Sequence, residues 1–175
     1  SSFDAVEGTR VVMSNSKMEE VMVAGIAADL AQVKLTLQDL PNRPGIAAMV
    51  FGILAEEAVV VDIIVQDQPA AGKLTLSFTV GEPDALKAKM VLGGKVKQEF
   101  PEMKILEEGR LAKVSAVGVG MQHHPGVAAK MFSLLAQAGV DIKLITTSEI
   151  KISCLVAADQ AKNAVDALHR GFGLG

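Results

Sequence analysis

The sequence of 175 residues contains no tryptophan, no tyrosine and only 6 phenylalanines. Proteins that bind single-stranded nucleic acid stack its bases on aromatic side chains, and proteins that bind duplexes carry a basic patch for the phosphates. The net charge is −3, and Lys and Arg form no stripe. The composition therefore excludes a nucleic-acid partner and indicates an aliphatic core of Val, Ile, Leu, Met and Ala.

Cys154 is the single cysteine, which excludes an internal disulfide and fits a reducing compartment. No apolar stretch approaches the length of a membrane span, and the run from Val59 to Val65 is interrupted by Asp62. The first ten residues, SSFDAVEGTR, lack the charged-then-apolar order of a signal peptide. We expect a cytoplasmic protein with no membrane partner.

The residue patterns of enzymes and metal proteins are also missing. The GVG run after a strand-like segment lacks the spacing of a phosphate-binding loop. His123, His124 and His169 have no metal-ligand spacing and no supporting cysteine pair. We expect His123 and His124 to be solvated turn residues and Cys154 to be an inert, buried thiol. The sequence thus predicts no catalytic residue, no metal and no cofactor.

The chain does contain an internal sequence repeat of two copies. It reads VKLTLQDLPNRPGIAAMVFGILAEEAVVVDIIVQ around Pro44 and KVSAVGVGMQHHPGVAAKMFSLLAQAGVDIKLIT around Pro125. The two prolines are 125 − 44 = 81 residues apart, and Gly45 matches Gly126 in the same register. A duplicated unit of this size predicts two related small domains, and their shared interface is a natural place for a small ligand.

Each copy predicts the order strand, helix, strand, strand, helix. In the first copy, alternation places Val33, Leu35 and Leu37 on a core face. We expect each Pro-Gly proline in the first turn of its helix, and Gly93-Gly94 at the end of the second helix. The residues expected to point inward from the later strands are Leu74, Leu76, Phe78 and Val80, and Ile150, Ile152, Cys154 and Val156.

A short strand near Lys104–Leu106 completes the first copy, whereas the second ends after its second helix. Val21–Ala27 is a strand-like run that the first copy does not need. We therefore predict an α+β protein of two ferredoxin-like βαββαβ domains, with four-stranded antiparallel sheets covered by helices on one face. The first domain would span residues 32–108; the second, residues 112–174, would be completed by the N-terminal strand, residues 21–28.

The Pro-Gly turns are the candidate binding features. Each brings a glycine, Gly45 or Gly126, to a helix start, where free backbone N–H groups attract a carboxylate and a ligand can approach closely. Asp62 lies in an apolar strand and could pair with a ligand ammonium group. Together these groups suit a free amino acid. A plain strand-to-helix turn with Asp62 on a solvated face explains the residues about equally well.

The motifs PNRPGIAAMVFGILAE, VVVDIIVQ and LSFTV, and the long segment AKVSAVGVGMQHHPGVAAKMFSLLAQAGVDIKLITTSEIKISCLV, resemble the C-terminal regulatory region of bacterial aspartate kinases. The resemblance extends to the final ALHRGFGLG, and LITTSEIKIS carries it most specifically. It implies two ACT domains without the kinase domain, with residues 1–20 coming from the kinase junction. Met18 resembles an internal start, so the chain is similar to a separate regulatory subunit or to an excised fragment.

The family resemblance implies feedback inhibition by lysine, threonine or both, bound between a first and a second ACT domain. Partners would be a second regulatory chain or the catalytic alpha subunit. The implied contacts are Asn42, Ala47, Val60, Val61, Asp62 and Gln66 in the first domain, and Asp141, Ile142, Thr147 and Ser148 in the second.

Three positions depart from the family pattern. Asn42 replaces a usual Asp, Asp141 stands where Asn is frequent, and Asp67-Gln68-Pro69 replaces Asn-Val-Ser. These changes move charge near the implied effector. A ligand-independent assembly module is the alternative function, and a metal carrier is disfavoured because paired cysteines are missing.

Overall fold

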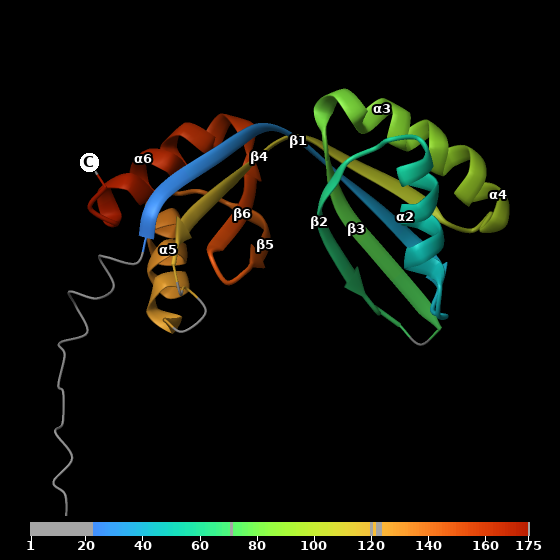
Figure 1. Cartoon of the computed structure of the whole chain (residues 1–175), viewed down its shortest axis with the longest axis horizontal. Coiled ribbons are helices and arrows are strands. Elements are labelled where there is room, and N and C mark those ends of the chain that lie inside the picture. The colour runs from blue at the N-terminus through green and yellow to red at the C-terminus, as the bar shows by residue number, and fades with distance from the viewer. Residues whose placement is uncertain (1–22, 71, 120, 122–123, 175) are drawn as a thin grey trace, which may run out of the picture.

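The structure is a computed structural model that describes residues 23–70, 72–119, 121 and 124–174. Six strands form one sheet in the order β2-β3-β1-β4-β6-β5, and all neighbouring pairs are antiparallel. Figure 1 shows this sheet bent into an arch, with helices covering its outer side in each half.

The strands are β1 (Val23–Pro41), β2 (Val61–Asp67), β3 (Lys73–Gly81), β4 (Lys104–Gly118), β5 (Ile142–Thr147) and β6 (Lys151–Ala157). The helical segments are α2 (Ile46–Glu56), α3 (Glu82–Val91), η1 (Leu92–Val96), α4 (Lys97–Glu99), α5 (Pro125–Gln137), η3 (Ala158–Gln160) and α6 (Ala161–Gly171).

Strands β1 and β4 run through both halves of the arch. From Gln32 to Pro41, β1 lies between β3 and the first part of β4. From Val23 to Asp29, β1 instead pairs with the second part of β4, which pairs on its other side with β6. The expected completion of the second sheet by the N-terminal strand is confirmed. Residues 21 and 22 of the expected strand lie outside the described residues.

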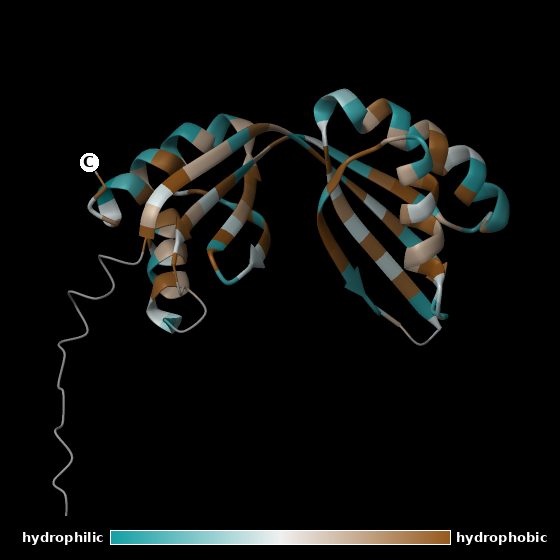
Figure 2. Cartoon of the chain, viewed as in Figure 1, coloured by the Kyte–Doolittle hydropathy of each residue, from teal (hydrophilic) through white to brown (hydrophobic). Residues whose placement is uncertain are grey.

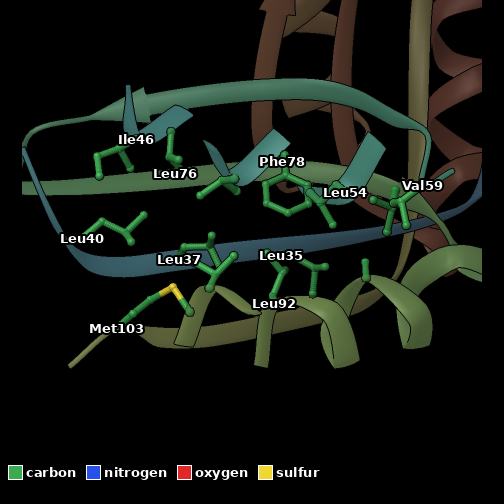
Figure 3. Close-up of a cluster of buried hydrophobic side chains, with 14 of the residues drawn as sticks. Leu35, Leu37, Leu40, Ile46, Leu54, Val59, Leu76, Phe78, Leu92 and Met103 are labelled. Carbon is green, nitrogen blue, oxygen red and sulfur yellow. The ribbon is translucent and has the colours of Figure 1, made fainter. Parts of the chain in front are cut away.

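The first core lies between the first half of the sheet and the helices α2, α3 and η1. The strand residues in this core are fully or almost fully buried. They include the residues for which the alternating pattern predicted an inward position: Val33, Leu35 and Leu37 of β1, and Leu74, Leu76, Phe78 and Val80 of β3. Figure 2 shows hydrophobic and hydrophilic residues alternating along β3. In Figure 3, Phe78 lies in one cluster with Leu35, Leu54 and Leu92, which come from three other elements. Full burial of side chains of this size contributes about 1.5–3 kcal/mol each.

The second core is a separate cluster under α5 and α6. Val127, Met131 and Leu135 of α5 face Cys154 and Val156 of β6, all of them nearly or fully buried. Val23 of β1 belongs to the same cluster. The two clusters share no buried member, which supports the proposed division into residues 32–108 and residues 21–28 plus 112–174. The expected N-terminal segment, residues 1–20, lies outside the described residues.

Three local predictions are wrong. Ile150 is exposed rather than inward, because the turn before β6 includes it. Gly93-Gly94 does not end the second helix of the first half, which continues as the π-helical turn η1 and α4. Leu92 and Val96 flank the glycines and are fully buried, and that burial outweighs the cost of about 1 kcal/mol for each helical glycine.

The third error concerns the first Pro-Gly turn. Pro125 begins α5 as predicted, but Pro44 lies in the turn before α2. Gly45 has a left-handed backbone (φ 92°) and serves as the N-cap, so the helix cannot begin until Ile46. The Gly45 carbonyl accepts the first helical hydrogen bond, from the Met49 N–H at 2.9 Å. The two turns therefore present their helix starts differently.

Candidate ligand-binding site

A cavity of about 330 Å³ opens at the Pro-Gly turn of the first half. It lies where the end of β1, the start of α2 and the end of β2 converge. The turn is held in place by the Asn42 N–H, which donates to the Gly72 carbonyl at 3.0 Å. The lining residues are Asn42, Arg43, Pro44, Gly45, Ile46, Ala47, Gln66 and Leu74. Four of the predicted contacts, Asn42, Gly45, Ala47 and Gln66, are thus brought together.

The start of α2 lines this cavity without a capping side chain. Gly45 has no side chain to cap the helix, and the first turn contains no acidic residue. A Cβ built on Gly45 would meet nothing within 4 Å, so the space beside this backbone is open. N–H groups at an uncapped helix start point along the positive end of the helix dipole. A carboxylate of a small ligand can bind there.

Arg43 is the lining residue that reasoning from the sequence missed. Its guanidinium donates to the Glu99 carboxylate at 3.3 Å and lies 5.6 Å from the centre of the Phe100 ring. It is the only lining residue with a charged side chain. Asn42 accepts a long hydrogen bond from the Gln68 amide at 3.5 Å. A sequence signal did exist, because Arg43 directly follows the candidate Asn42 in the same turn.

The second half has an equivalent cavity of about 440 Å³. Thr147 and Ser148 enter it from the end of β5, and the Ser148 N–H donates to the Lys151 carbonyl at 2.8 Å. Gly126 is the second residue of α5 and does not line the cavity. The lining residues are Met121, His124, Pro125, Ala128, Thr147, Ser148, Glu149 and Ile152. His123, for which a solvated turn was expected, lies outside the described residues.

The remaining first-half candidates lie at the other end of β2. Val60 is 73% exposed, and its N–H is 3.5 Å from the Asp84 carboxylate. Val61 is half-buried against the first core. The Asp62 carboxylate accepts a hydrogen bond from the ammonium group of Lys113, on β4 in the second half. Asp62 and Gln66 are four residues apart, or about 13 Å along a strand, and Asp62 lines neither cavity.

Asp141 and Ile142 lie at the start of β5, away from the cavity at its end. The Asp141 carboxylate pairs with Lys143 at 2.7 Å, and this hydrogen bond raises the pKa of the Lys143 ammonium group. The Asp141 N–H donates to the Gln160 side chain at 3.2 Å, and Ile142 packs against the second core. Because β2 and β5 are the opposite edges of the sheet, the predicted residues fall into two separate groups in one chain.

The comparisons with known proteins agree with this architecture. A family model described as "ACT domain" matches residues 114–172. Two modules of ferredoxin-like topology, the second completed by the N-terminal part of β1, define a tandem ACT protein.

An aspartokinase of Mycolicibacterium smegmatis is 38% identical over 179 aligned residues, and this alignment covers 100% of the chain and 42% of that relative. The ligand-free regulatory subunit of aspartate kinase from Thermus thermophilus is 39% identical, with a TM-score of 0.80, over 86% of this chain and 99% of that one. The chain belongs to the regulatory ACT region of the aspartate kinases.

Two further structures bear on partners. A crystal structure of aspartokinase alpha and beta subunits contains a chain that is 37% identical, with a TM-score of 0.77 and coverage of 86% of this chain and 99% of that one. Aspartokinase III of E. coli, in complex with lysine and aspartate, is 26% identical with a TM-score of 0.67, over 86% of this chain and 33% of that one. The chain spans about 42% of the length of the curated aspartokinases that it matches. In the described part of the chain, no helix has the length and apolarity needed to cross a membrane.

Proposed function

We propose that this regulatory region senses a free amino acid, threonine or lysine, and transmits its binding to an aspartate kinase as feedback inhibition. The kinase would transfer the ATP γ-phosphate to the side-chain carboxylate of aspartate, and we propose no catalytic residue for that reaction in this chain. The observation that carries the proposal is the cavity at Gly45. Its uncapped helix start, the Arg43 guanidinium and the Gln66 amide suit the α-carboxylate of an amino acid.

A complete site would need a second chain. Strands β2 and β5 are sheet edges, and their exposed residues include Ile64, Val65 and Ile145. Unpaired edges with apolar side chains favour pairing with another strand. We propose a homodimer in which β2 of one copy lies beside β5 of the other. With antiparallel pairing, as in every strand pair of the sheet, Gln66 at the end of β2, with Asn42, Gly45 and Ala47 beside it, would face Asp141 and Ile142 at the start of β5 of the second copy. Thr147 and Ser148 of that copy would then lie toward Val61 and Asp62, with Gly126 in the adjacent helix α5.

Titration calorimetry with threonine and lysine, separately and together, tests the proposal. We expect heat from at least one of them. Gln66→Ala should weaken that binding about tenfold or more, because one hydrogen bond to a charged group contributes about 1.5–3 kcal/mol. Gln98→Ala, which changes an exposed residue of α4 outside the cavity, is the matched control and should bind as the unmodified chain does.

The exposed edge residues also support the second candidate, a ligand-independent assembly module. The absence of heat with either amino acid, combined with a stable dimer in light scattering, would favour that module. A binding-competent monomer would contradict both the dimer and the shared site. The catalytic alpha subunit of an aspartate kinase remains the other proposed partner, and it can be tested by mixing the two chains.

A further inference from the structure

The two ACT modules are connected at a narrow, irregular crossing. The pairing of β1 with β4 shifts register between Asp29 and Gln32 and again between Gln32 and Lys34. Arg110, opposite this stretch on β4, has a left-handed backbone with φ 56°. The Gln32 side chain donates to Asp29 at 2.8 Å, but its own Oε1 is buried without a hydrogen-bond partner in the described structure. A regular ladder of backbone hydrogen bonds between two strands resists bending, whereas the ladder between β1 and β4 is irregular in both strands at this point.

One side-chain ion pair bridges the modules across this crossing. The ammonium group of Lys113, on β4 of the second module, donates to the carboxylate of Asp62, on β2 of the first. Every other ion pair found among the described residues joins groups of the same module. The Lys113 side chain is only 17% exposed, and that of Asp62 is 36% exposed. Partial burial protects the pair from screening by salt.

Local structure directs Asp62 toward this partner. The pairing of β2 with β3 shifts between Val61 and Ile64, which inserts one extra residue into β2. The Ile63 N–H donates to the Thr79 hydroxyl at 3.1 Å instead of to the backbone ladder. A bulge of this kind re-aims the neighbouring side chains and bends its strand. Figure 1 shows β2 on the inner side of the arch, facing the second module.

The open faces of the two sheets are also buried near this pair. Thr79 and Leu155 are 0% exposed, yet neither belongs to a core cluster. Since Cys154 and Val156 point into the second core, Leu155 points to the helix-free face of β6. Leu155 pairs with Lys113 in the register of β4 with β6, so it lies on the same face of the sheet as the ion pair. The helix-free face is therefore closed to solvent beside the Lys113–Asp62 pair.

We propose that Asp62 and Lys113 form a lock that fixes the relative orientation of the two ACT modules. The crossing at Gln32 and Arg110 is the hinge that the lock restrains. Asp62 is then a positioning residue, since its ammonium partner comes from the chain itself and it lines neither cavity. This part of the inference depends only on the ion pair and the irregular crossing, so it stands apart from the proposed function.

Spin labels on the two modules measure their orientation directly. Ala55 of α2 and Ala136 of α5 are exposed and equivalent in the repeat, so Ala55→Cys with Ala136→Cys places one label on each module. Buried Cys154 stays unlabelled at neutral pH, because burial raises the pKa of its thiol to about 11. Dilution with unlabelled chain removes distances between copies. Double electron–electron resonance should give one narrow distance in the unmodified background.

Breaking the lock should change that distance distribution. We expect Asp62→Asn to broaden it or to add a second distance, and the swap Asp62→Lys with Lys113→Asp to restore the narrow peak. Glu107→Gln removes the Lys89–Glu107 pair inside the first module and should leave the distribution unchanged. Circular dichroism confirms that each variant is folded. If folded Asp62→Asn keeps the narrow distance, or if Glu107→Gln broadens it equally, the lock is refuted.

A second measurement separates positioning from ligand contact, and it rests on the proposed function. If Asp62 only positions the modules, the charge-swapped chain binds threonine or lysine as the unmodified chain does. If Asp62 contacts the ligand ammonium group, the swap places a lysine against that group and binding is lost, which refutes the positioning role. An unmodified chain that binds neither amino acid refutes the proposed function, while the label distances still decide the lock.

Discussion

Ala58 and Gly139 occupy the same place in the two modules, 139 − 58 = 81 residues apart, and both have left-handed backbones, with φ of 55° and 67°. Each directly follows the last turn of a helix, and each N–H donates to a helix carbonyl, Ala55 or Ala136, at 3.0 Å. A left-handed residue other than glycine costs about 1–2 kcal/mol. One module therefore carries a strain that its counterpart avoids.

Exchanging these two residue types should have opposite effects. We expect Ala58→Gly to leave stability unchanged or raise it by up to about 1 kcal/mol, since relief of strain is partly offset by chain entropy. Gly139→Ala should lower stability by about 1 kcal/mol. A Cβ at Gly139 meets nothing within 4 Å, so backbone strain is the only cost. Urea unfolding measures the change in unfolding free energy for both variants, and equal changes of the same sign would contradict the explanation by backbone strain.

A second stability prediction concerns the contact of α6 with α5. A Cβ at Gly171 would lie 2.3 Å from both terminal methyl carbons of Leu134. Gly171→Ala should therefore force Leu134 out of its rotamer and cost about 1–3 kcal/mol. Gly52→Ala is the matched control, because a Cβ there meets nothing within 4 Å in the exposed face of α2. It should stabilise by up to about 1 kcal/mol. Thermal unfolding of both variants tests the pair, and a neutral Gly171→Ala would mean that Leu134 repacks freely.

The buried thiol of Cys154 predicts a pH dependence of stability. Burial raises its pKa to about 11, above the value of about 8.5 in an unfolded chain. The unfolded state therefore loses the proton first as pH rises. The stabilising effect is complete below about pH 8.5 and is lost as pH rises toward 11, by at most about 1.4 kcal/mol per pH unit.

The measurement is the difference in unfolding free energy between the unmodified chain and Cys154→Val from pH 7 to pH 10.5. Valine fills similar space without titrating, and so it serves as the control for other groups. A difference that stays constant with pH would show that the thiol does not titrate in this window. Thiol-reactive reagents should modify native Cys154 only at the rate of unfolding, and faster labelling would contradict its burial.

The shared strand β1 predicts which module depends on the N-terminal residues. A chain that begins at Ala31 lacks the strand segment from Val23 to Asp29, which pairs with β4. We expect its second core to lose protection in amide hydrogen exchange while the first core keeps it. A chain that begins at Val23 is the control and should protect both cores. Persistent protection of β5 and β6 in the shorter chain would refute the dependence.

Much of this architecture follows from the sequence. Alternation identified the inward residues of β3, and the missing fourth strand of the second repeat identified the role of β1. Strand periodicity works here because one face of β3 is apolar and packs against the helices, whereas the other carries the polar residues Thr75, Ser77 and Thr79. The repeat register singled out the two Pro-Gly turns, each of which lines a cavity. Asn42, Gly45, Ala47 and Gln66 lie together in the first of them because they are local to one turn and one strand end.

Other features depend on arrangements that no local pattern encodes. The partner of Asp62 is 51 residues away in sequence, and only the bend of the sheet brings Lys113 to it. Gly93-Gly94 suggested a helix end because propensity is a weak prior that burial of Leu92 and Val96 overrides. The turn at Pro44 differed from that at Pro125 because the conformation of Gly45, not the proline, decides where α2 begins.

The two strands common to both modules have a consequence for folding. Val23 pairs with Gly118, 118 − 23 = 95 residues later in the chain, so the N-terminal part of β1 leaves the ribosome long before its partner exists. The first module has all its strands as soon as the first half of β4 emerges. The second must close a loop that encloses the whole first module, and contacts of such separation form slowly. We infer that the first module folds during synthesis and that the second module, which must pair the early-made end of β1 with the late-made end of β4, folds last and limits the overall rate.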